Sequence, residues 1–82
     1  QADLMIYPNP VTNGQLTLEL NNADIIPKAN ITIYDLQGQI VYNEEVENLQ
    51  SKTLDLNMLN KGMYFIHVAS EQISIIRKVI IK

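Results

Sequence analysis

The stretch Gly62-Met63-Tyr64-Phe65-Ile66-His67-Val68-Ala69-Ser70, together with the run from Ile73 to Lys82, decides the fold of this chain. Both segments are apolar and rich in β-branched and aromatic residues, and only Glu71 and Gln72 lie between them. Such a pair of runs predicts two antiparallel strands joined as a hairpin. Because the second run occupies the last ten positions of the sequence, we expect the C-terminal residues to belong to the folded structure.

The composition is that of one small folded domain. The chain has 82 residues, of which 46% are hydrophobic, and this is too apolar for a disordered segment. Cysteine is absent, which excludes disulfides and thiolate metal sites. Neither a signal segment nor a run of about 18 apolar residues occurs. Because the sequence also begins at Gln1 rather than at Met, we expect a fragment excised from a longer polypeptide.

The charges are distributed unevenly along the chain. The formal net charge is −3, yet Arg77, Lys78 and Lys82 all lie within the last six positions. The remaining body is therefore acidic and would repel a phosphate backbone. Since no phosphate loop, dinucleotide motif or basic-aromatic surface is present either, the sequence argues against nucleic-acid and nucleotide binding.

Turn residues divide the sequence upstream of the hairpin into short β-type runs. Residues 3–7 form a first strand that ends at the rigid corner Pro8-Asn9-Pro10. Asn13-Gly14 suits a tight turn, and residues 15–20 then alternate without fault, with three leucines on one face. Pro27 is expected to break the run that Ile25 and Ile26 begin.

The middle of the chain continues this pattern of strands and turns. Strands are predicted at residues 30–36, 39–46 and 53–56, with Gly38 supplying the turn between the first two. Residues 47–51 are expected to form a polar loop. Residues 57–62 are interpreted as a single helical turn closed by Gly62.

About seven short strands at a spacing of roughly 8 to 12 residues predict an all-β, antiparallel β-sandwich. Both faces of the last strand are apolar, so its inward face stays undecided. The predicted core consists of alternating apolar residues, namely Leu16, Leu18, Leu20, Ile31, Ile33, Ile40, Leu54, Leu56, Leu59, Tyr64, Ile66, Val68 and several of residues 73–81.

No arrangement of side chains predicts catalysis. His67 is the sole histidine, and Ser70 and Ser74 lie nearby in sequence, but His67 and Ser70 are an odd number of positions apart and face opposite sides of a strand. The acidic cluster at residues 44–47 lies on a predicted strand, where adjacent carboxylates diverge and stay solvated. We therefore expect no enzyme activity and no cofactor.

Two further patterns are too weak to assign a site. Asn21, Asn22 and Asp24 carry oxygen ligands but lack the regular acidic spacing of a calcium loop, so no metal is expected. Asn30-Ile31-Thr32 matches the N-glycosylation pattern, but it lies inside a predicted strand.

Three blocks, in this order, resemble the C-terminal sorting domain of type IX (Por) secretion cargo proteins. The first is Tyr7-Pro8-Asn9-Pro10 with Asn13-Gly14 and the strand after it. The second is the strand-turn-strand block at residues 33–41, which contains Gly38. The third runs from Leu56 through Gly62 and Tyr64 to the Lys-terminated last strand. The turn Ser70-Glu71-Gln72 lacks the glycine that the family often has there.

The resemblance implies an Ig-like β-sandwich of about seven strands, spanning residues 1–82, at the C-terminus of a secreted protein. It implies a cargo domain linked covalently on the N-terminal side, in a protein that reaches the periplasm of a Gram-negative bacterium. The domain would then address its cargo to the type IX outer-membrane translocon. A sortase-like peptidase would commonly remove it, and the cargo would be released or attached to lipopolysaccharide at the cell surface. The residues expected to be read by the translocon are Tyr7, Pro8, Asn9, Pro10, Gly38, Gly62, Tyr64, Lys78 and Lys82.

Two alternatives stay open on the residues alone. The terminal cations Arg77, Lys78 and Lys82 are also typical of gatekeepers that protect an apolar edge strand from aggregation. The whole chain also fits a β-sandwich that serves a secreted enzyme as a spacer, adhesion or carbohydrate-binding module. One Phe, four Tyr and no Trp make a poor platform for a glycan.

Overall fold

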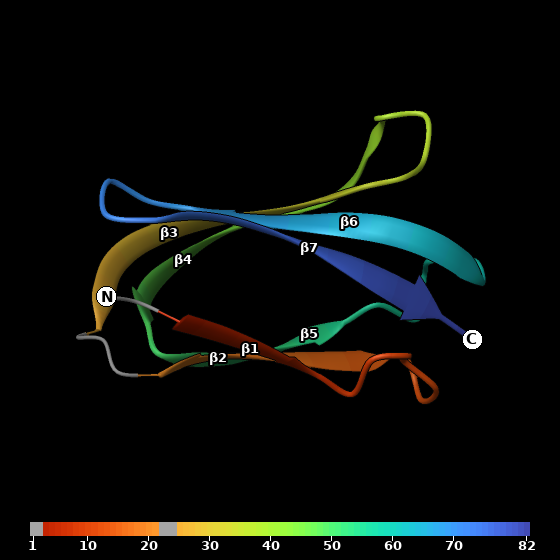
Figure 1. Cartoon of the computed structure of the whole chain (residues 1–82), viewed down its shortest axis with the longest axis horizontal. Helices are drawn as coiled ribbons and strands as arrows, with labels where there is room; N and C mark the ends of the chain where they lie inside the picture. The colour runs from red at the N-terminus through yellow and green to blue at the C-terminus, as the bar shows by residue number, and fades with distance from the viewer. Residues whose placement is uncertain (1–2, 22–24) are drawn as a thin grey trace.

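A computed structural model of the chain describes residues 3–21 and 25–82, and this part is entirely of β type (Figure 1). Because no helix forms in it, it contains none that is long and apolar enough to cross a membrane. The prediction of an all-β fold is thus confirmed. The described strands are β1 (Asp3–Tyr7), β2 (Gln15–Asn21), β3 (Ile26–Tyr34), β4 (Ile40–Leu49), β5 (Ser51–Asp55), β6 (Gly62–Ala69) and β7 (Ser74–Ile81).

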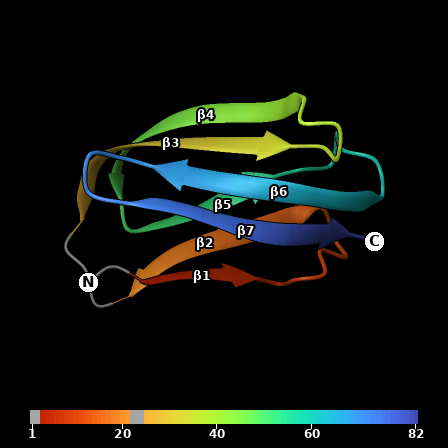
Figure 2. The ribbon, with the colours of Figure 1, turned by 45° about the horizontal axis from the view of Figure 1, so that its top comes forward.

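The strands form two facing sheets (Figures 1 and 2). One sheet has the order β1-β2-β5 and the other the order β4-β3-β6-β7, and neighbours within each sheet are antiparallel. This is the strand order of an immunoglobulin-type sandwich in which the fourth strand joins the larger sheet. The predicted antiparallel β-sandwich is confirmed.

Alternation along the strands builds one core between the two sheets. Leu16, Leu18 and Leu20 of β2 are buried, as are Ile31 and Ile33 of β3 across the sandwich. All these residues belong to one apolar cluster. The sequence predictions missed five members of this cluster, which are Leu4, Val11, Ile26, Ala29 and Leu49.

The predicted C-terminal hairpin is present, with β6 paired to β7 from Gly62 opposite Ile81 to Ala69 opposite Ser74. Val79 and Ile81 point into the core, which settles the inward face of the last strand. The glycine-free turn is closed by a side chain, because the Ser70 hydroxyl accepts hydrogen bonds from the amides of Gln72 (3.0 Å) and Ile73 (3.1 Å).

Two predicted interruptions turn out to be strands. Pro27 lies within β3, at a part of the strand that pairs with β4 but extends beyond β6, so its missing N–H breaks no ladder on that side. Residues 47–49 belong to β4 rather than to a loop, and only Gln50 separates β4 from β5. The chain crosses between the sheets at this point, and the buried Leu49 anchors the crossing in the core.

Two local predictions were wrong for reasons of geometry. Ile40 is 62% exposed because the register between β3 and β4 shifts after Ile33, so that Tyr34 pairs with Ile40 and the neighbouring Val41 packs against the core instead. Residues 57–58 form one turn, closed by the hydrogen bond from the amide of Leu59 to the carbonyl of Leu56 (3.0 Å), and residues 59–61 are irregular, so the predicted helical turn is absent. Leu59, predicted to be in the core, is only partly buried against it.

Candidate functional site

Residues 9–11, from the first sequence block, lie against the outer edge of β7, which belongs to the third block. The side-chain amide of Asn9 donates to the carbonyl of Lys78 (2.9 Å) and its oxygen accepts from the amide of Ile80 (3.1 Å). The amide of Val11 then donates to the carbonyl of Ile80 (2.7 Å), and the amide of Lys82 donates to the carbonyl of Val11 (2.8 Å). Residues 9–11 thus lie along β7, and Val11 forms a parallel bridge with Ile81. These contacts join positions about 70 residues apart.

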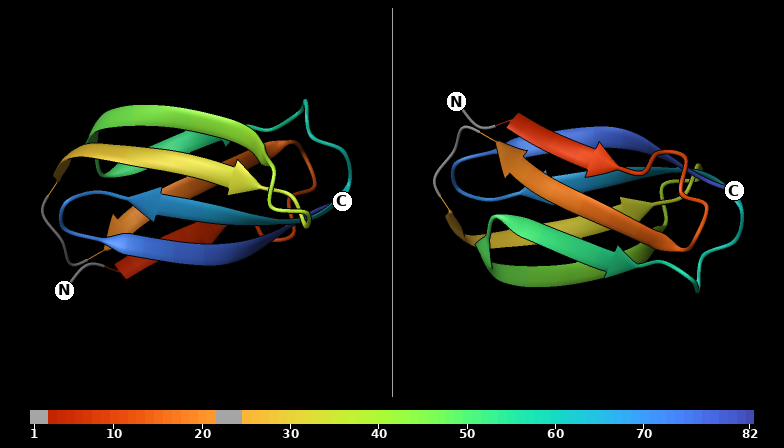
Figure 3. Two further views of the ribbon diagram at one scale, coloured as in Figure 1. Left: turned by 90° about the horizontal axis from the view of Figure 1, so that it is seen from above. Right: turned by 90° about the horizontal axis from the view of Figure 1, so that it is seen from below.

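The remaining motif residues gather at the same end of the sandwich, which we call the motif end. Residues 8–14, the β3–β4 turn, the β5–β6 connection and the C-terminal residue all lie there in each view, whereas the β6–β7 turn lies at the opposite end (Figures 1 and 3). The motif end exists only in the folded chain, because the topology alone brings its segments together.

Gly38 stands at the tip of the β3–β4 turn with a φ of 86°, and no other segment of the described chain lies within 4 Å of the place that a Cβ would take, so its role is backbone conformation. The carboxylate of Asp35 holds the turn by accepting from the amides of Gln37 and Gln39, both at 2.9 Å. The turn geometry predicted for Gly38 is therefore present.

Gly62 and Tyr64 support the motif end from inside. Gly62 opens β6 opposite Ile81 with a φ of 151°, a conformation that side chains rarely adopt. Tyr64 is buried, and its hydroxyl donates to the carbonyl of Asn60 (2.7 Å). Both residues therefore shape the surface rather than present side chains on it.

Tyr7 is exposed but not free. Its hydroxyl donates to the carboxylate of Glu19 on β2 (2.8 Å), and this hydrogen bond raises the pKa of the Tyr7 phenol. The flanking prolines Pro8 and Pro10 are exposed at the corner where the chain leaves one sheet and reaches the edge of the other.

Lys78 and Lys82 are exposed and point away from the core, since the alternate residues Val79 and Ile81 point inward. Neither lysine forms an ion pair with any residue in the described part of the chain, and the same holds for Lys61 and Arg77. Lys28 and Lys52, by contrast, face Glu45 (3.9 Å) and Glu44 (3.2 Å). The uncompensated positive charge therefore lies on or beside the β6–β7 hairpin.

The outer face of the larger sheet carries apolar side chains next to Lys78, which the sequence analysis did not single out. One row crosses the sheet from Ile40 through Tyr34 and Phe65 to Lys78, each opposite the next. Ile40 and Phe65 are 62% and 38% exposed. The alternation of Met63 and Phe65 with the buried residues of β6 was the signal that could have revealed this face.

His67 and Ser74 are brought together, although the pair weighed most closely from the sequence was His67 with Ser70. The His67 imidazole Nε2 lies 2.9 Å from the Ser74 hydroxyl across the β6–β7 pair. No carboxylate in the described residues is hydrogen-bonded to His67, and the pair lies on the exposed sheet face. The geometry is that of a cross-strand contact.

In the acidic cluster of β4, Glu44 and Glu45 each form an ion pair with a lysine. The Tyr42 hydroxyl donates to the Glu44 carboxylate (2.5 Å), and this bond is the main cause that lowers the pKa of Glu44, with Lys52 adding to it. Burial and the same hydrogen bond raise the pKa of Tyr42 to about 12. A carboxyl with a lowered pKa is poorly suited to act as a general acid.

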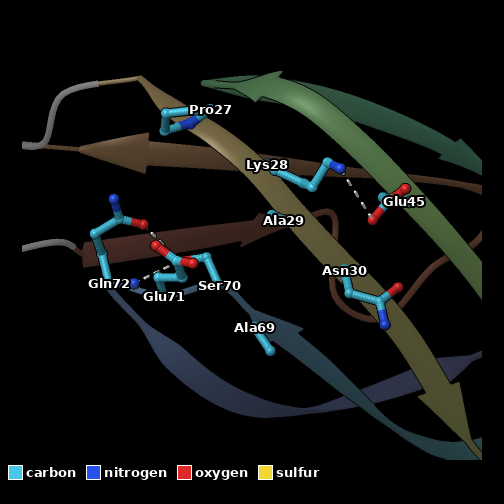
Figure 4. A pocket seen from close by; sticks show the side chains of 9 residues that line it. All are labelled: Pro27, Lys28, Ala29, Asn30, Glu45, Ala69, Ser70, Glu71 and Gln72. Carbon is cyan, nitrogen blue, oxygen red and sulfur yellow. Dashed lines mark hydrogen bonds and ion pairs between the residues drawn. The ribbon is translucent and has the colours of Figure 1, made fainter.

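A pocket (Figure 4) is lined in part by the β6–β7 turn, which lies at the opposite end of the molecule from the motif end (Figure 1). An exposed ion pair, Lys28 with Glu45, stands at one side, and the turn that Ser70 closes stands at the other. Its lining residues carry no catalytic combination and are Pro27, Lys28, Ala29, Asn30, Glu45, Ala69, Ser70, Glu71 and Gln72.

The two weak sequence patterns gain no support as sites. Asn30 of the glycosylation pattern sits in β3, and its side-chain oxygen accepts from Asn43 (3.1 Å). No group of three or more His, Cys, Asp or Glu side chains that could hold a metal occurs among residues 3–21 and 25–82. Asn22 and Asp24 of the calcium-like segment lie outside the described residues.

Comparison with known protein families gives one result that spans nearly the whole chain. Residues 5–82 match the family model described as "Secretion system C-terminal sorting domain". The matched range includes all three sequence blocks and the motif end that they build. No curated protein matches the chain. The chain therefore belongs to the family of C-terminal sorting domains of type IX (Por) secretion systems.

Proposed function

We propose that this chain is a non-catalytic signal read in its folded form by the type IX outer-membrane translocon. The observation that carries the proposal is the motif end, where residues 9–11 are hydrogen-bonded to residues 78–82. A surface built from both ends of the sequence reports that the chain has folded. The exposed and unpaired Lys78 and Lys82 give this surface its charge.

In this role the domain acts on a protein covalently linked on its N-terminal side. The linked cargo crosses the periplasm of a Gram-negative bacterium and is delivered to the cell surface or the medium. A sortase-like peptidase of the secretion system removes the domain, and the cargo is then released or attached to the surface. Catalysis and cofactors are not part of the proposal, in keeping with the general nature of sorting-signal families.

The proposal is tested with a periplasmic reporter that carries residues 1–82 at its C-terminus, expressed in a strain with an active type IX system. The unaltered fusion should reach the surface or medium. Lys78→Gln combined with Lys82→Gln should accumulate in the periplasm, although each exposed substitution changes stability by only about 0.5 kcal/mol or less. Lys28→Gln with Lys52→Gln removes the same charge elsewhere and should be exported normally.

Two results would contradict the proposal. Retention of the unaltered fusion in the periplasm would show that the chain does not act as a sorting signal in that strain. Normal export of a folded fusion with both Lys78 and Lys82 replaced would show that these lysines act as gatekeepers of the edge strand and that the motif end is not read through them.

A further inference from the structure

The free edge of β7 is divided into an occupied half and an open half. Residues 9–11 occupy the edge from the carbonyl of Lys78 to the amide of Lys82, with four hydrogen bonds at 2.7 to 3.1 Å. This segment runs parallel to β7 and ends its pairing at the motif end. A partner strand therefore has no access to the C-terminal half of this edge.

The N-terminal half of the same edge is open. Ile80 directs both its amide and its carbonyl away from β6, towards Asn9 and Val11. Because these directions repeat every second residue in an antiparallel strand, Ile76 and Ser74 also direct their backbone groups outward. Within the described residues no other segment bonds to them, and the carbonyl of Ile76 receives only the guanidinium of its neighbour Arg77 (3.3 Å). Ile76 is also 61% exposed.

The side chains along this open half specify what kind of strand would fit it. Arg77 and Lys78 are successive residues, so they project from opposite faces of β7, and neither is paired with a carboxylate in the described chain. An added strand would place one side chain beside each of them. Ile76 lies next to His67 on the outer face and offers an apolar surface. The complementary strand carries carboxylates at neighbouring positions and an apolar residue beside Ile76.

We propose that residues 74–78 of β7 receive an acidic, strand-forming segment of the secretion machinery, which extends the larger sheet by one strand. This inference rests on the proposed function and names the mode of contact with the partner. Main-chain hydrogen bonds to the open edge would supply affinity, and the carboxylates would supply specificity. A second copy that paired through its own β7 fits less well, because it would bring a second set of the same cations to the edge. An anionic lipid or polysaccharide surface would attract the cations but would not pair with the outward backbone amides of β7.

The substitution Ile76→Pro tests the inference in the reporter fusion. Proline removes the outward amide and adds bulk at the edge, and it is tolerated at edge positions whose N–H faces solvent. Ile76→Ala removes the same apolar side chain but keeps the amide, so it is the matched control. We expect Ile76→Pro to be exported about tenfold or more less efficiently than Ile76→Ala, which corresponds to about 1.4 kcal/mol of binding. Thermal melting of both purified fusions confirms that they are folded.

A second pair of variants, at Ser74, tests the inference if the Ile76→Pro fusion does not fold. Ser74→Pro removes the outward amide at the first residue of β7, where proline is better tolerated, and Ser74→Ala is its control. Reduced export of the folded proline variant relative to its alanine control supports strand addition. Equal export of the two overturns it.

Other outcomes identify a different occupant. Sedimentation of the purified fusion should show a monomer, and a dimer that Ile76→Pro dissociates would assign the edge to a second copy and overturn the inference. Export that depends on Lys78 and Lys82 but is equal for the proline and alanine variants would show recognition by charge alone, as expected for an anionic lipid or polysaccharide. Retention of the unaltered fusion contradicts the proposed function itself, and is thereby distinguished from failure of this inference alone.

Discussion

The side chain of Asn9 pairs with the backbone of β7 as a neighbouring strand would. Its amide nitrogen and oxygen reach the carbonyl of Lys78 and the amide of Ile80, so one side chain satisfies two edge groups. Asparagine suits this position because it carries a donor and an acceptor at the same distance from the backbone. Aspartate would lack the donor towards the Lys78 carbonyl.

Asn9→Ala should therefore loosen the motif end measurably. The loss of two hydrogen bonds should lower the free energy of unfolding by about 1 to 2 kcal/mol. Asn60→Ala is the control, because the Asn60 side chain makes no hydrogen bond within the described residues and is exposed. Urea denaturation measures both, and equal midpoints for the two variants would show that the Asn9 contacts do not stabilise the fold.

The hydrogen bond from Tyr42 to Glu44 provides a pH-dependent test at the same scale. Glu44 has a lowered pKa in the folded state, so its contribution to stability is present above the ordinary carboxyl pKa and is lost as the pH falls through the folded value. Tyr42→Phe should raise the pKa of Glu44 and cost about 1 kcal/mol near neutral pH. The difference in unfolding free energy between the unaltered domain and Tyr42→Phe should become smaller at acid pH.

Titration of the Glu44 carboxyl by NMR, with denaturation at several pH values, checks this expectation. Tyr42 itself affects the stability at alkaline pH. Its pKa is raised to about 12, so the unfolded chain ionises first, and stability should fall as the pH rises from about 10 towards 12. A stability difference that stays constant between neutral and acid pH would contradict the assigned role of Glu44.

At the scale of single elements, two turns offer a matched comparison. Gly14 and Gly38 have similar positive φ values of 77° and 86°. A Cβ at Gly14 would lie 2.0 Å from the side-chain oxygen of Asn57, whereas at Gly38 no described residue other than its chain neighbours lies within 4 Å of that place. Asn57 is itself held there by a hydrogen bond to Asp55 (2.8 Å). A substitution at either glycine would therefore carry the same backbone strain, but only at Gly14 would the added Cβ clash with Asn57.

Gly14→Ala should therefore destabilise the domain more than Gly38→Ala does. The positive φ should cost about 1 kcal/mol in both, and displacement of Asn57 should add about 1 kcal/mol to the first. In an Asn57→Ala background the cost of Gly14→Ala should fall to that of Gly38→Ala. A double-mutant cycle by denaturant unfolding measures this coupling. Additive effects would show that Asn57 does not crowd Gly14.

Most elements could be predicted from local patterns, and the failures have physical causes. The alternation in residues 15–20 and the two apolar runs of the hairpin identify their strands directly, because one face of each is buried. The break predicted at Pro27 was wrong, because a proline interrupts a strand only where its missing N–H would face a paired strand, and β3 has no β6 partner at Pro27. The β4–β5 crossing was read as a loop, since its polar residues hide the one buried anchor, Leu49.

Several residues of the motif end could be named from the sequence, but the way they come together could not. The resemblance named Tyr7 to Pro10 and the terminal lysines, yet nothing local shows that Asn9 would bond to β7. That contact depends on the order of strands in two sheets. The exposure of Ile40 likewise depends on a register shift, which no single-strand pattern encodes.

For the whole molecule, export should depend on folding, because the motif end exists only in the folded chain. Leu18 is fully buried in the core, so Leu18→Ala should cost about 2 to 5 kcal/mol. A chain of this length has a total stability of roughly 4 to 12 kcal/mol, at about 0.05 to 0.15 kcal/mol per residue. A domain this small is expected at the lower end of that range, where such a loss leaves the variant fusion partly unfolded at growth temperature and poorly exported, although every exposed motif residue is retained.

Export measured at two temperatures separates this effect from a loss of contact. Lowering the temperature towards the stability maximum should restore export of Leu18→Ala in proportion to the folded fraction. Ile25→Ala changes an exposed residue far from the motif end and should be exported normally. Full export of Leu18→Ala while it is unfolded would mean that the signal is read as a linear sequence.

The most direct test of the central claim is to map which end of the folded domain touches the secretion machinery. A photoreactive amino acid is placed, one position at a time, at the exposed residues Leu36 and Met58 of the motif end and at the exposed residues Glu47 and Gln50 of the opposite end. Glu47 lies on β4 and Gln50 follows it, on the side of the larger sheet farthest from the open edge of β7. The reporter fusions are irradiated in cells during export, and the crosslinked partners are identified by mass spectrometry. Recognition through the motif end should give crosslinks to translocon proteins from Leu36 and Met58, with few from Glu47 and Gln50. Equal crosslinking from both ends, or crosslinking from the opposite end alone, would contradict it.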